Sequence, residues 1–323
     1  MKKGALVISL DFEMLWGMRD HTSLESSYAQ TIKKVPEVSE KLLALFQKYQ
    51  VHATWATVGL LMANEEEKRV QNLPLHHPSY VNKALDSYTY LEEAKREKEY
   101  YQCGTLLDSI KQTPGQEIAS HTFSHYYATE EGQTKEEFRA DLDKACEVAL
   151  HHGLHLTSLV FPRNQFNENY RSVLQEKGIT SYRGCQDGWM YDSGNNNNNF
   201  GRALKLLDTY FPLTGHNSYA TDTPEFGESP LNLKGSCFLR MYNRKLKAFE
   251  GLKVRRIRSE MKHAAQRGEV FHLWFHPHNV TVNPEKNLRL IEQILSYYQE
   301  LHTKYMFESL TMDELSSILL KNK

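Results

Sequence analysis

The sequence lacks a strong charge imbalance, a paired-cysteine motif and a long apolar run. Its 39 Lys and Arg residues are balanced by 40 Asp and Glu residues, for a formal net charge of −1. This balance argues against a dominant field for nucleic acid, and we expect no nucleic-acid partner. The four cysteines, at positions 103, 146, 185 and 237, form no Cys-x-x-Cys pair. They therefore indicate buried free thiols rather than a disulfide framework or a thiolate zinc site.

No apolar stretch is long enough to span a bilayer. The N-terminus has a basic start and a short apolar run, which meets the acidic residues Asp11 and Glu13 too early for a secretory signal. We therefore expect a cytoplasmic protein. At 323 residues, 40% hydrophobic and 24% charged, the chain suits one large α/β domain or two modest ones.

Apolar periodicity predicts alternating strands and helices. Residues 5–12 and 51–58 have the pattern of buried strands, and residues 36–50 between them have helical spacing. A strand, helix and strand in this order imply a parallel sheet with helices outside it. Further strands are predicted over 156–161, 179–182 and 270–275, and further helices over 134–149 (opened by a capping box), 168–177, 287–301 and 312–320.

Two segments depart from this alternation. Residues 64–115 carry three prolines and little periodicity, and we interpret them as an insertion packed over the mouth of the fold. Residues 240–267 are rich in Lys and Arg, opposed only by Glu250 and Glu260. The simplest interpretation of this basic segment is a solvated helix face. The alternative is attraction of phosphate, on a nucleotide-sugar or on a lipid carrier at a membrane surface.

Two carboxylates close the first predicted strand. Because side chains alternate along a strand, Asp11 and Glu13 are expected to point the same way, with Phe12 facing the opposite layer. Acids at a strand end are often only solvated. Two acids on one face are also how an α/β enzyme presents catalytic groups.

A histidine pair follows another short apolar run. If the chain turns helical at Ser120, His121 and His125 lie one turn apart on one face, a spacing at which two imidazoles bind one divalent ion. Such a pair needs a third ligand, usually a carboxylate. Since the chain has 15 histidines, the spacing alone is a weak signal.

Polar residues close two further strands, as Pro162-Arg163-Asn164 and as His276-Pro277-His278. Carboxyl ends of parallel strands are where sites assemble, so four such ends predict a shared site.

With these motifs the sequence resembles the polysaccharide deacetylase family, the NodB homology domain of carbohydrate esterase family 4. The resemblance covers about residues 4–280. It implies a distorted (β/α) barrel of about seven parallel strands, forming a single domain over 1–323 with the insertion at about 64–115 and C-terminal helices over 286–323. It also implies a divalent metal, most often zinc, with cobalt or manganese compatible with the same ligands.

The resemblance also implies roles for individual residues. Asp11 would be the general base, and His121 and His125 would bind the metal. The family's first motif has adjacent aspartates, but Phe12 stands at the second position here. Glu13 is therefore the expected substitute as metal ligand, and the roles of Asp11 and Glu13 remain open to exchange.

Further roles follow from the same resemblance. Arg163 would orient the base and His276 would be the general acid, with His278 as a competing candidate whose simpler interpretation is a satisfied surface histidine. Asp187 and Trp189 are similar to the fourth motif. The residues expected to bind substrate are Trp16, Asn164, Trp189 and Trp274.

The leading hypothesis is a metal-dependent hydrolase that removes the N-acetyl group from an amino sugar of a polysaccharide or its cytoplasmic precursor. The substrate would then be an N-acetylated sugar, and residues 240–267 could contact a phosphate-bearing carrier. Two alternatives remain, hydrolysis of a small cyclic amide or imide on the same fold, and a sugar-binding protein without catalysis.

Overall fold

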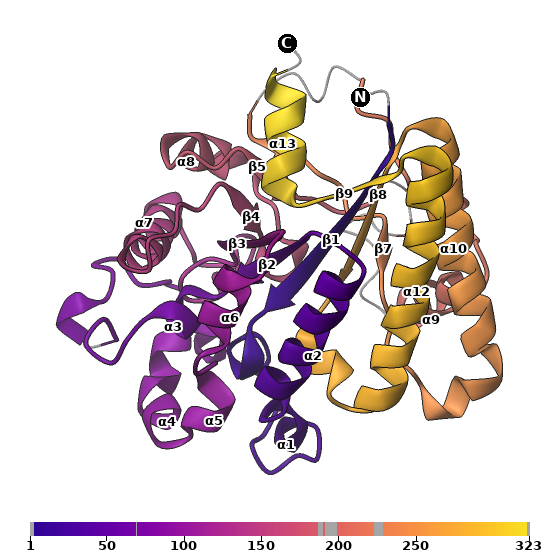
Figure 1. Cartoon of the computed structure of the whole chain (residues 1–323). Helices are drawn as coiled ribbons and strands as arrows, with labels where there is room; N and C mark the ends of the chain where they lie inside the picture. The colour runs from indigo at the N-terminus through magenta and orange to yellow at the C-terminus, as the bar shows by residue number, and fades with distance from the viewer. Residues whose placement is uncertain (1–2, 69, 187–189, 191–198, 223–228, 322–323) are drawn as a thin grey trace.

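The computed structural model describes residues 3–68, 70–186, 190, 199–222 and 229–321, and its centre is a parallel β-sheet (Figure 1). The sheet has nine strands in the order β6-β5-β4-β3-β2-β1-β8-β7, with β9 paired to β1. The strands are β1 (Ala5–Phe12), β2 (Ala53–Thr57), β3 (Gln116–Ser120), β4 (Ser158–Val160), β5 (Ser181–Arg183), β6 (Leu231–Asn232), β7 (Cys237–Phe238), β8 (Val270–Phe275) and β9 (Glu308–Leu310).

The sheet curls into a barrel that is closed by the stretch 231–239. On one side of this stretch, the N–H groups of Leu233 and Gly235 donate to the carbonyls of Tyr182 and Gly184, beside β5. On the other side, the Ser236 N–H donates to the carbonyl of a β8 residue. The predicted distorted (β/α) barrel is therefore confirmed. The strand count exceeds about seven because this stretch contributes two short strands and β9 is added beside β1.

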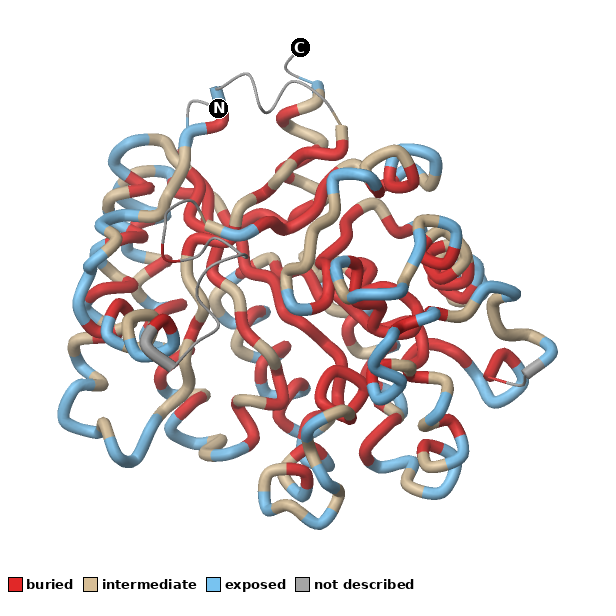
Figure 2. The backbone as a smooth tube through the Cα atoms, turned by 180° about the vertical axis from the view of Figure 1, so that it is seen from behind, coloured by how far each residue is buried: buried red, intermediate tan, exposed pale blue. Residues whose placement is uncertain are grey.

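Helices surround the barrel, and buried residues concentrate along the central strands (Figures 1 and 2). The predicted helices over 36–50, 134–149, 168–177, 287–301 and 312–320 are confirmed as α2, α7, α8, α12 and α13. The helices are α1 (Ala29–Ile32), α2 (Val35–Lys48), α3 (Gly59–Met62), α4 (Leu91–Arg96), α5 (Lys98–Tyr101), α6 (Leu106–Gln112), α7 (Lys135–His151), α8 (Arg171–Glu176), α9 (Asn199–Tyr210), α10 (Glu250–Arg267), α11 (Pro277–Val280), α12 (Pro284–Tyr305) and α13 (Met312–Lys321).

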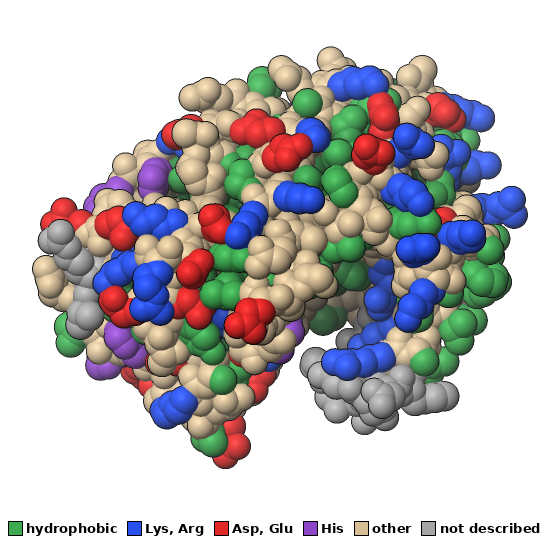
Figure 3. All heavy atoms as spheres, turned by 90° about the horizontal axis from the view of Figure 1, so that it is seen from below, with side chains coloured by type: hydrophobic (Ala, Val, Ile, Leu, Met, Phe, Trp, Pro, Cys, Tyr) green, Lys and Arg blue, Asp and Glu red, His purple; other side chains and the backbone are tan. Residues whose placement is uncertain are grey.

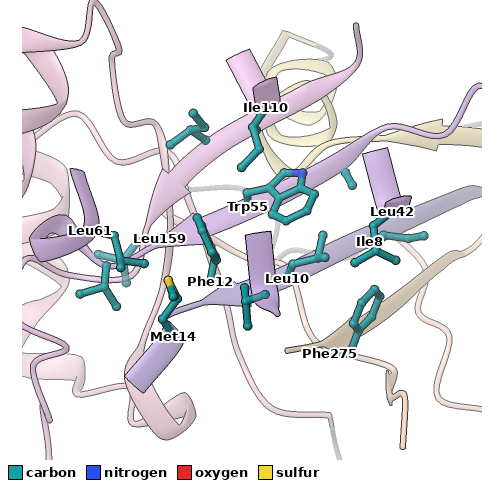
Figure 4. Packing of buried hydrophobic residues seen from close by; sticks show 14 of the residues in the cluster. Ile8, Leu10, Phe12, Met14, Leu42, Trp55, Leu61, Ile110, Leu159 and Phe275 are labelled. Atoms are coloured by element: carbon teal, nitrogen blue, oxygen red, sulfur yellow. The ribbon is translucent and has the colours of Figure 1, made fainter. Parts of the chain in front are cut away.

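Alternation along β1 separates two cores. Ile8, Leu10 and Phe12 belong to the outer core between sheet and helices, where the Phe12 ring meets Trp55 edge-on at 6.0 Å (Figure 4). Val7 points into the barrel and belongs to an inner core that α13 closes with apolar side chains. The inward positions nearer the carboxyl end of β1 are polar, so the barrel interior changes from apolar to polar toward that end.

Two local predictions are wrong. The chain does not become helical after Ser120, because Thr122 and His125 adopt left-handed φ angles of 62° and 57°. The basic segment 240–267 is not simply a solvated face, because Lys253 and Arg256 on α10 are buried. The buried charge of Arg256 is compensated by an ion pair, since its guanidinium lies 2.9 Å from the carboxylate of Asp208.

None of the described helices combines the length and the apolar character needed to cross a membrane.

Candidate metal centre

The carboxylates at the end of β1 lie on the barrel side, while Phe12 between them lies in the outer core. Glu13 is the residue that precedes a short 3-10 helix over Met14–Gly17, and its carboxylate packs against Gly17. A Cβ built on Gly17 would lie 2.1 Å from Cδ of Glu13. Only glycine leaves the room that this carboxylate occupies, so Gly17 is a site residue that the sequence motifs did not reveal.

The two histidines after β3 converge on Glu13. Nε2 of His121 lies 3.2 Å and Nε2 of His125 lies 2.9 Å from Oε2 of Glu13, and all three side chains are buried. Nδ1 of His121 lies 2.8 Å from the carbonyl oxygen of Val160, which can only accept a hydrogen bond. Nδ1 therefore carries the proton, and in the neutral ring the Nε2 lone pair faces the carboxylate. That arrangement is repulsive unless a cation lies between them.

A buried aspartate on α7 holds the loop that carries these histidines. Asp141 accepts hydrogen bonds from the backbone N–H groups of Phe123 and Ser124, at 2.7 and 3.0 Å, and from the Ser124 hydroxyl. Burial raises the pKa of Asp141 to about 6. This anchor replaces the helix expected from sequence, and it fixes both imidazoles without helical spacing.

Asp11 is paired with Arg183 at the end of β5. The guanidinium donates to both carboxylate oxygens, at 2.6 and 2.8 Å, and also to the Ser9 hydroxyl at 3.0 Å. The ring of Trp274 lies 4.2 Å below the guanidinium carbon. Burial alone would raise the pKa of the Asp11 carboxyl, but Arg183 and then His276 outweigh it and lower that pKa.

Arg163 is not placed where the sequence motif predicted it. Its side chain is 38% exposed and pairs with Asp20 at 2.6 Å, whereas Arg183 is buried against Asp11. Arg163 and Asn164 both adopt left-handed φ angles, of 56° and 53°, which turn the chain at the end of β4. Asn164 is the residue of this motif that reaches the site, where its Oδ1 accepts from Arg183 at 2.8 Å. The signal for Arg183 was present, as a polar residue closing a predicted strand.

The last motif brings two histidines to the opposite side of Glu13. Nε2 of His276 lies 3.5 Å from Oδ2 of Asp11, and its side chain is 21% exposed. His278 is not a surface histidine, because it is only 4% exposed, and burial lowers its pKa to about 3. The reason is that α11 begins at Pro277 and turns His278 inward, toward the ring of Tyr28.

The aromatic residues expected to stack on a sugar are placed differently. The indole of Trp16 is fully buried and donates to the carbonyl of Tyr101 at 3.1 Å, so it offers no face to a ligand. Trp274 is partly buried beside Phe238 and His276. Asp187 and Trp189 lie outside the described residues.

The donor set suits a divalent ion. Two groups of three residues each bring one ligand atom per residue within 4.8 Å of the others. The first group is Glu13, His121 and His125, and the second is Glu13, His276 and His278. Burial lowers the pKa of His125 to about 4, so this ring is neutral and its nitrogen is free to coordinate. Two imidazoles and one carboxylate leave coordination positions open for water and substrate.

Comparison with known proteins identifies the family and the fold. A family model described as polysaccharide deacetylase matches residues 21–182, half of the chain. No curated protein matches the sequence. A crystal structure of a "putative polysaccharide deacetylase" from Mycobacterium smegmatis matches with a TM-score of 0.63 and 15% identity, over 100% of this chain and 92% of that one. A GH57-type branching enzyme from the archaeon Pyrococcus horikoshii matches with a TM-score of 0.51 and 11% identity, over 98% of this chain and 70% of that one.

At these identities the two structures show a shared fold and no more. The family match covers half of the chain, so the protein belongs to the polysaccharide deacetylase family. The predicted resemblance is confirmed. Membership supports a deacetylase function, which is a hydrolase activity. The match includes His121 and His125 but ends before Arg183 and His276, so the geometry of those two residues is independent of it.

Proposed function

We propose that this protein hydrolyses the N-acetyl group of an amino sugar, in a polysaccharide or its precursor, with a divalent ion held by Glu13, His121 and His125. The observation that carries the proposal is the convergence of one buried carboxylate and two buried imidazoles, with the His121 lone pair directed at Glu13. Zinc is the ion we propose, and cobalt or manganese would suit the same ligands.

The bound ion would supply a Lewis acid that activates water and polarises the amide carbonyl. Asp11 would accept the proton of the attacking water. Its pairing with Arg183 and the ligand distances of Glu13 support this division of roles over the reverse. The buried arginine keeps the Asp11 carboxylate ionised at neutral pH, which is the form that can accept a proton.

His276 would protonate the departing amine. Its Nε2 faces Asp11 and Glu13 at 3.5 and 3.8 Å, and its exposed edge gives a substrate access. Asn279 lies on the other side of the ring, 3.5 Å from Nδ1. An amine leaves only when protonated, so a donor on this side of the site is required, and proton transfer of this kind contributes roughly 10²–10⁴-fold.

A groove of about 420 Å³ runs outward from Phe238 and Asn279, which flank His276, past Arg240, Tyr242 and Arg244. Figure 3, viewed toward the carboxyl ends of the strands, shows a hollow with Lys and Arg side chains gathered along one side. We propose that the sugar occupies this groove. Its cations support an anionic group on the substrate, such as the phosphate of a carrier.

The direct test is acetate release from N-acetylhexosamine conjugates by metal-loaded protein, compared with chelator-treated protein and with His121→Ala. We expect both treatments to lower the rate by at least about 10²-fold, because the hydrolytic water loses its activation. His155→Ala, which alters an exposed histidine, is the matched control. Undiminished activity in chelator and in His121→Ala would contradict the proposal. Ring opening of a cyclic amide without acetate release would favour the alternative substrate class, and glycan binding without any hydrolysis would favour a binding protein.

A further inference from the structure

Glu13 stands between two histidine pairs. Its Oε2 faces His121 and His125, as described above. Its other oxygen, Oε1, lies 3.8 Å from Nε2 of His276 and 3.8 Å from Nδ1 of His278. The hydrolysis proposed above uses His121 and His125 as ligands and His276 as acid, and it assigns nothing to His278.

Nδ1 of His278 is a buried polar atom without a hydrogen-bond partner among the described residues. The residue is 4% exposed and its backbone is fixed by a hydrogen bond from the Thr281 hydroxyl to its carbonyl, at 2.6 Å. A buried polar group left unpaired is destabilising. The ring is nevertheless held with this nitrogen aimed at a carboxylate oxygen, which indicates a ligand that sits between them.

We propose a second cation site formed by Oε1 of Glu13, Nε2 of His276 and Nδ1 of His278, with the Glu13 carboxylate bridging it to the first. Ligand atoms of one tetrahedral zinc ion lie about 3.4 Å apart, given bonds of roughly 2.1 Å. The two 3.8 Å separations from Glu13 require only a small closure of the side chains, and the ligand atoms of all three residues lie within 4.8 Å of one another. Ions bridged in this way lie about 3.5–4 Å apart in two-metal sites.

Electrostatic repulsion makes the second ion bind more weakly than the first. Arg183 balances the charge of Asp11, so Glu13 alone offers a net negative charge to both ions. The first ion neutralises that charge and repels the second. We therefore expect the second dissociation constant to be at least roughly tenfold larger. His276 is partly exposed, which gives this ion a path from solvent.

Occupation of the second site has a consequence for catalysis that rests on the proposed function. Nε2 of His276 cannot donate a proton while it coordinates an ion. Activity should therefore rise as the first equivalent of metal is added and fall as the second binds. The site would act as an inhibitory cation site, specific for ions that accept imidazole nitrogen, such as zinc and cobalt.

The test is titration of the metal-free full chain with Zn²⁺ by calorimetry, and with Co²⁺ by its visible absorption. We expect two equivalents for the wild type, one for His278→Ala and two for His155→Ala. The tight equivalent of His278→Ala should keep its affinity within about threefold, because none of its own ligands changes. His278→Phe, which keeps a ring against Tyr28, covers the case in which the alanine variant fails to fold.

A single equivalent in the wild type, or two in both His278 variants, would overturn the second site. His121→Ala separates this outcome from failure of the first centre, because it should remove the tight equivalent and leave the weaker one. Two equivalents without inhibition by excess zinc would leave the second site standing and overturn the assignment of His276 as the acid.

Discussion

At the scale of single residues, the buried pair of Asp11 and Arg183 organises the polar end of the barrel. Arg183 is 1% exposed and is held by Asp11, Ser9 and Asn164, so its charge is fully committed inside the fold. His272 extends this network, with Nε2 2.8 Å from the Ser9 hydroxyl. The members come from β1, β5, β8 and the turn after β4, and the orientation of the Asp11 carboxylate depends on all of them.

Replacing Arg183 and Arg163 one at a time tests which arginine orients Asp11. The structure predicts Arg183, and the sequence motif predicted Arg163. We expect Arg183→Met to lower kcat/KM by about 10²–10⁴-fold, because the base loses its orientation. It should also lower the free energy of unfolding by about 3–5 kcal/mol, because Asp11 is left buried and unpaired. Arg163→Met removes partly exposed pairs with Asp20 and Glu130 and a contact with the Tyr127 ring, and it should have a much smaller effect on both quantities. The measurements are steady-state kinetics and urea unfolding.

The dependence of kcat/KM on pH tests the same role of Arg183, through the direction in which its acidic limb shifts. Arg183 lowers the pKa of Asp11, so the wild-type base stays ionised toward acidic pH. In Arg183→Lys, which keeps a charge but loses the two-pronged contact, that pKa should rise and the acidic limb of kcat/KM should shift to higher pH. Equal profiles in wild type and Arg183→Lys, or equal losses in the Arg163 and Arg183 variants, would contradict the assigned role.

At the scale of elements, the loop after β3 depends on the helix that follows it. Helix α7 begins at a capping box, in which the N–H of Glu137 donates to the Thr134 hydroxyl and Glu137 accepts from the N–H of Thr134. This start sets the rotation of the helix and therefore the position of Asp141. The metal-binding loop is thus positioned by a neighbouring element rather than by its own conformation.

Asp141→Asn should weaken binding of the first ion by about 10–100-fold, as the loss of supporting contacts typically does. The amide that replaces the carboxylate presents a donor toward one of the backbone N–H groups it must accept from. Asp143→Asn, on the same helix but half-exposed beside Lys177, is the matched control. Zinc affinity measured by competition with a chelating dye checks the difference. Equal zinc affinity in the two variants would show that the loop after β3 keeps its conformation without Asp141.

At the scale of the whole molecule, the proposed ion connects parts of the barrel that are far apart in sequence. Glu13 follows β1, and the histidines follow β3, with β2 between these strands. At the other end of the barrel, α13 closes the inner core with Met312 and Leu315. The two ends are therefore closed by different means, apolar packing at one and proposed coordination at the other.

Metal loading should raise the thermal stability of the whole chain. A ligand at 100 times its dissociation constant stabilises the native state by about 2.7 kcal/mol. For a chain of this size that corresponds to a rise in Tm of roughly 5 °C. Differential scanning calorimetry of metal-free and zinc-loaded protein measures it. The double variant His121→Ala/His278→Ala should show no rise, and an equal rise in that variant would place the stabilising ion elsewhere.

The sequence alone determined the main strands β1, β2, β4, β5 and β8, five of the surrounding helices, the parallel sheet, and the convergence of polar strand ends on one side of it. Alternation along β1 predicted that Asp11 and Glu13 share a face and that Phe12 faces the outer core, because this pattern depends only on local backbone geometry. The same local reasoning failed after Ser120. The hydrogen bonds that shape that loop come from Asp141, 17 and 18 residues away from their donors along the chain, and spacing carries no information about them.

Only the tertiary structure decided which side chains meet. Arg163 and Arg183 both close strands, and only the left-handed turn at Arg163 and the curl of the sheet bring Arg183 rather than Arg163 onto Asp11. Burial in the folded chain likewise shows that His278 is not a surface histidine. It also shows that Trp16 cannot stack on a sugar. Residue types and spacing fix what chemistry a chain can offer. Contacts between strands that are distant in sequence fix which of those groups share one cavity.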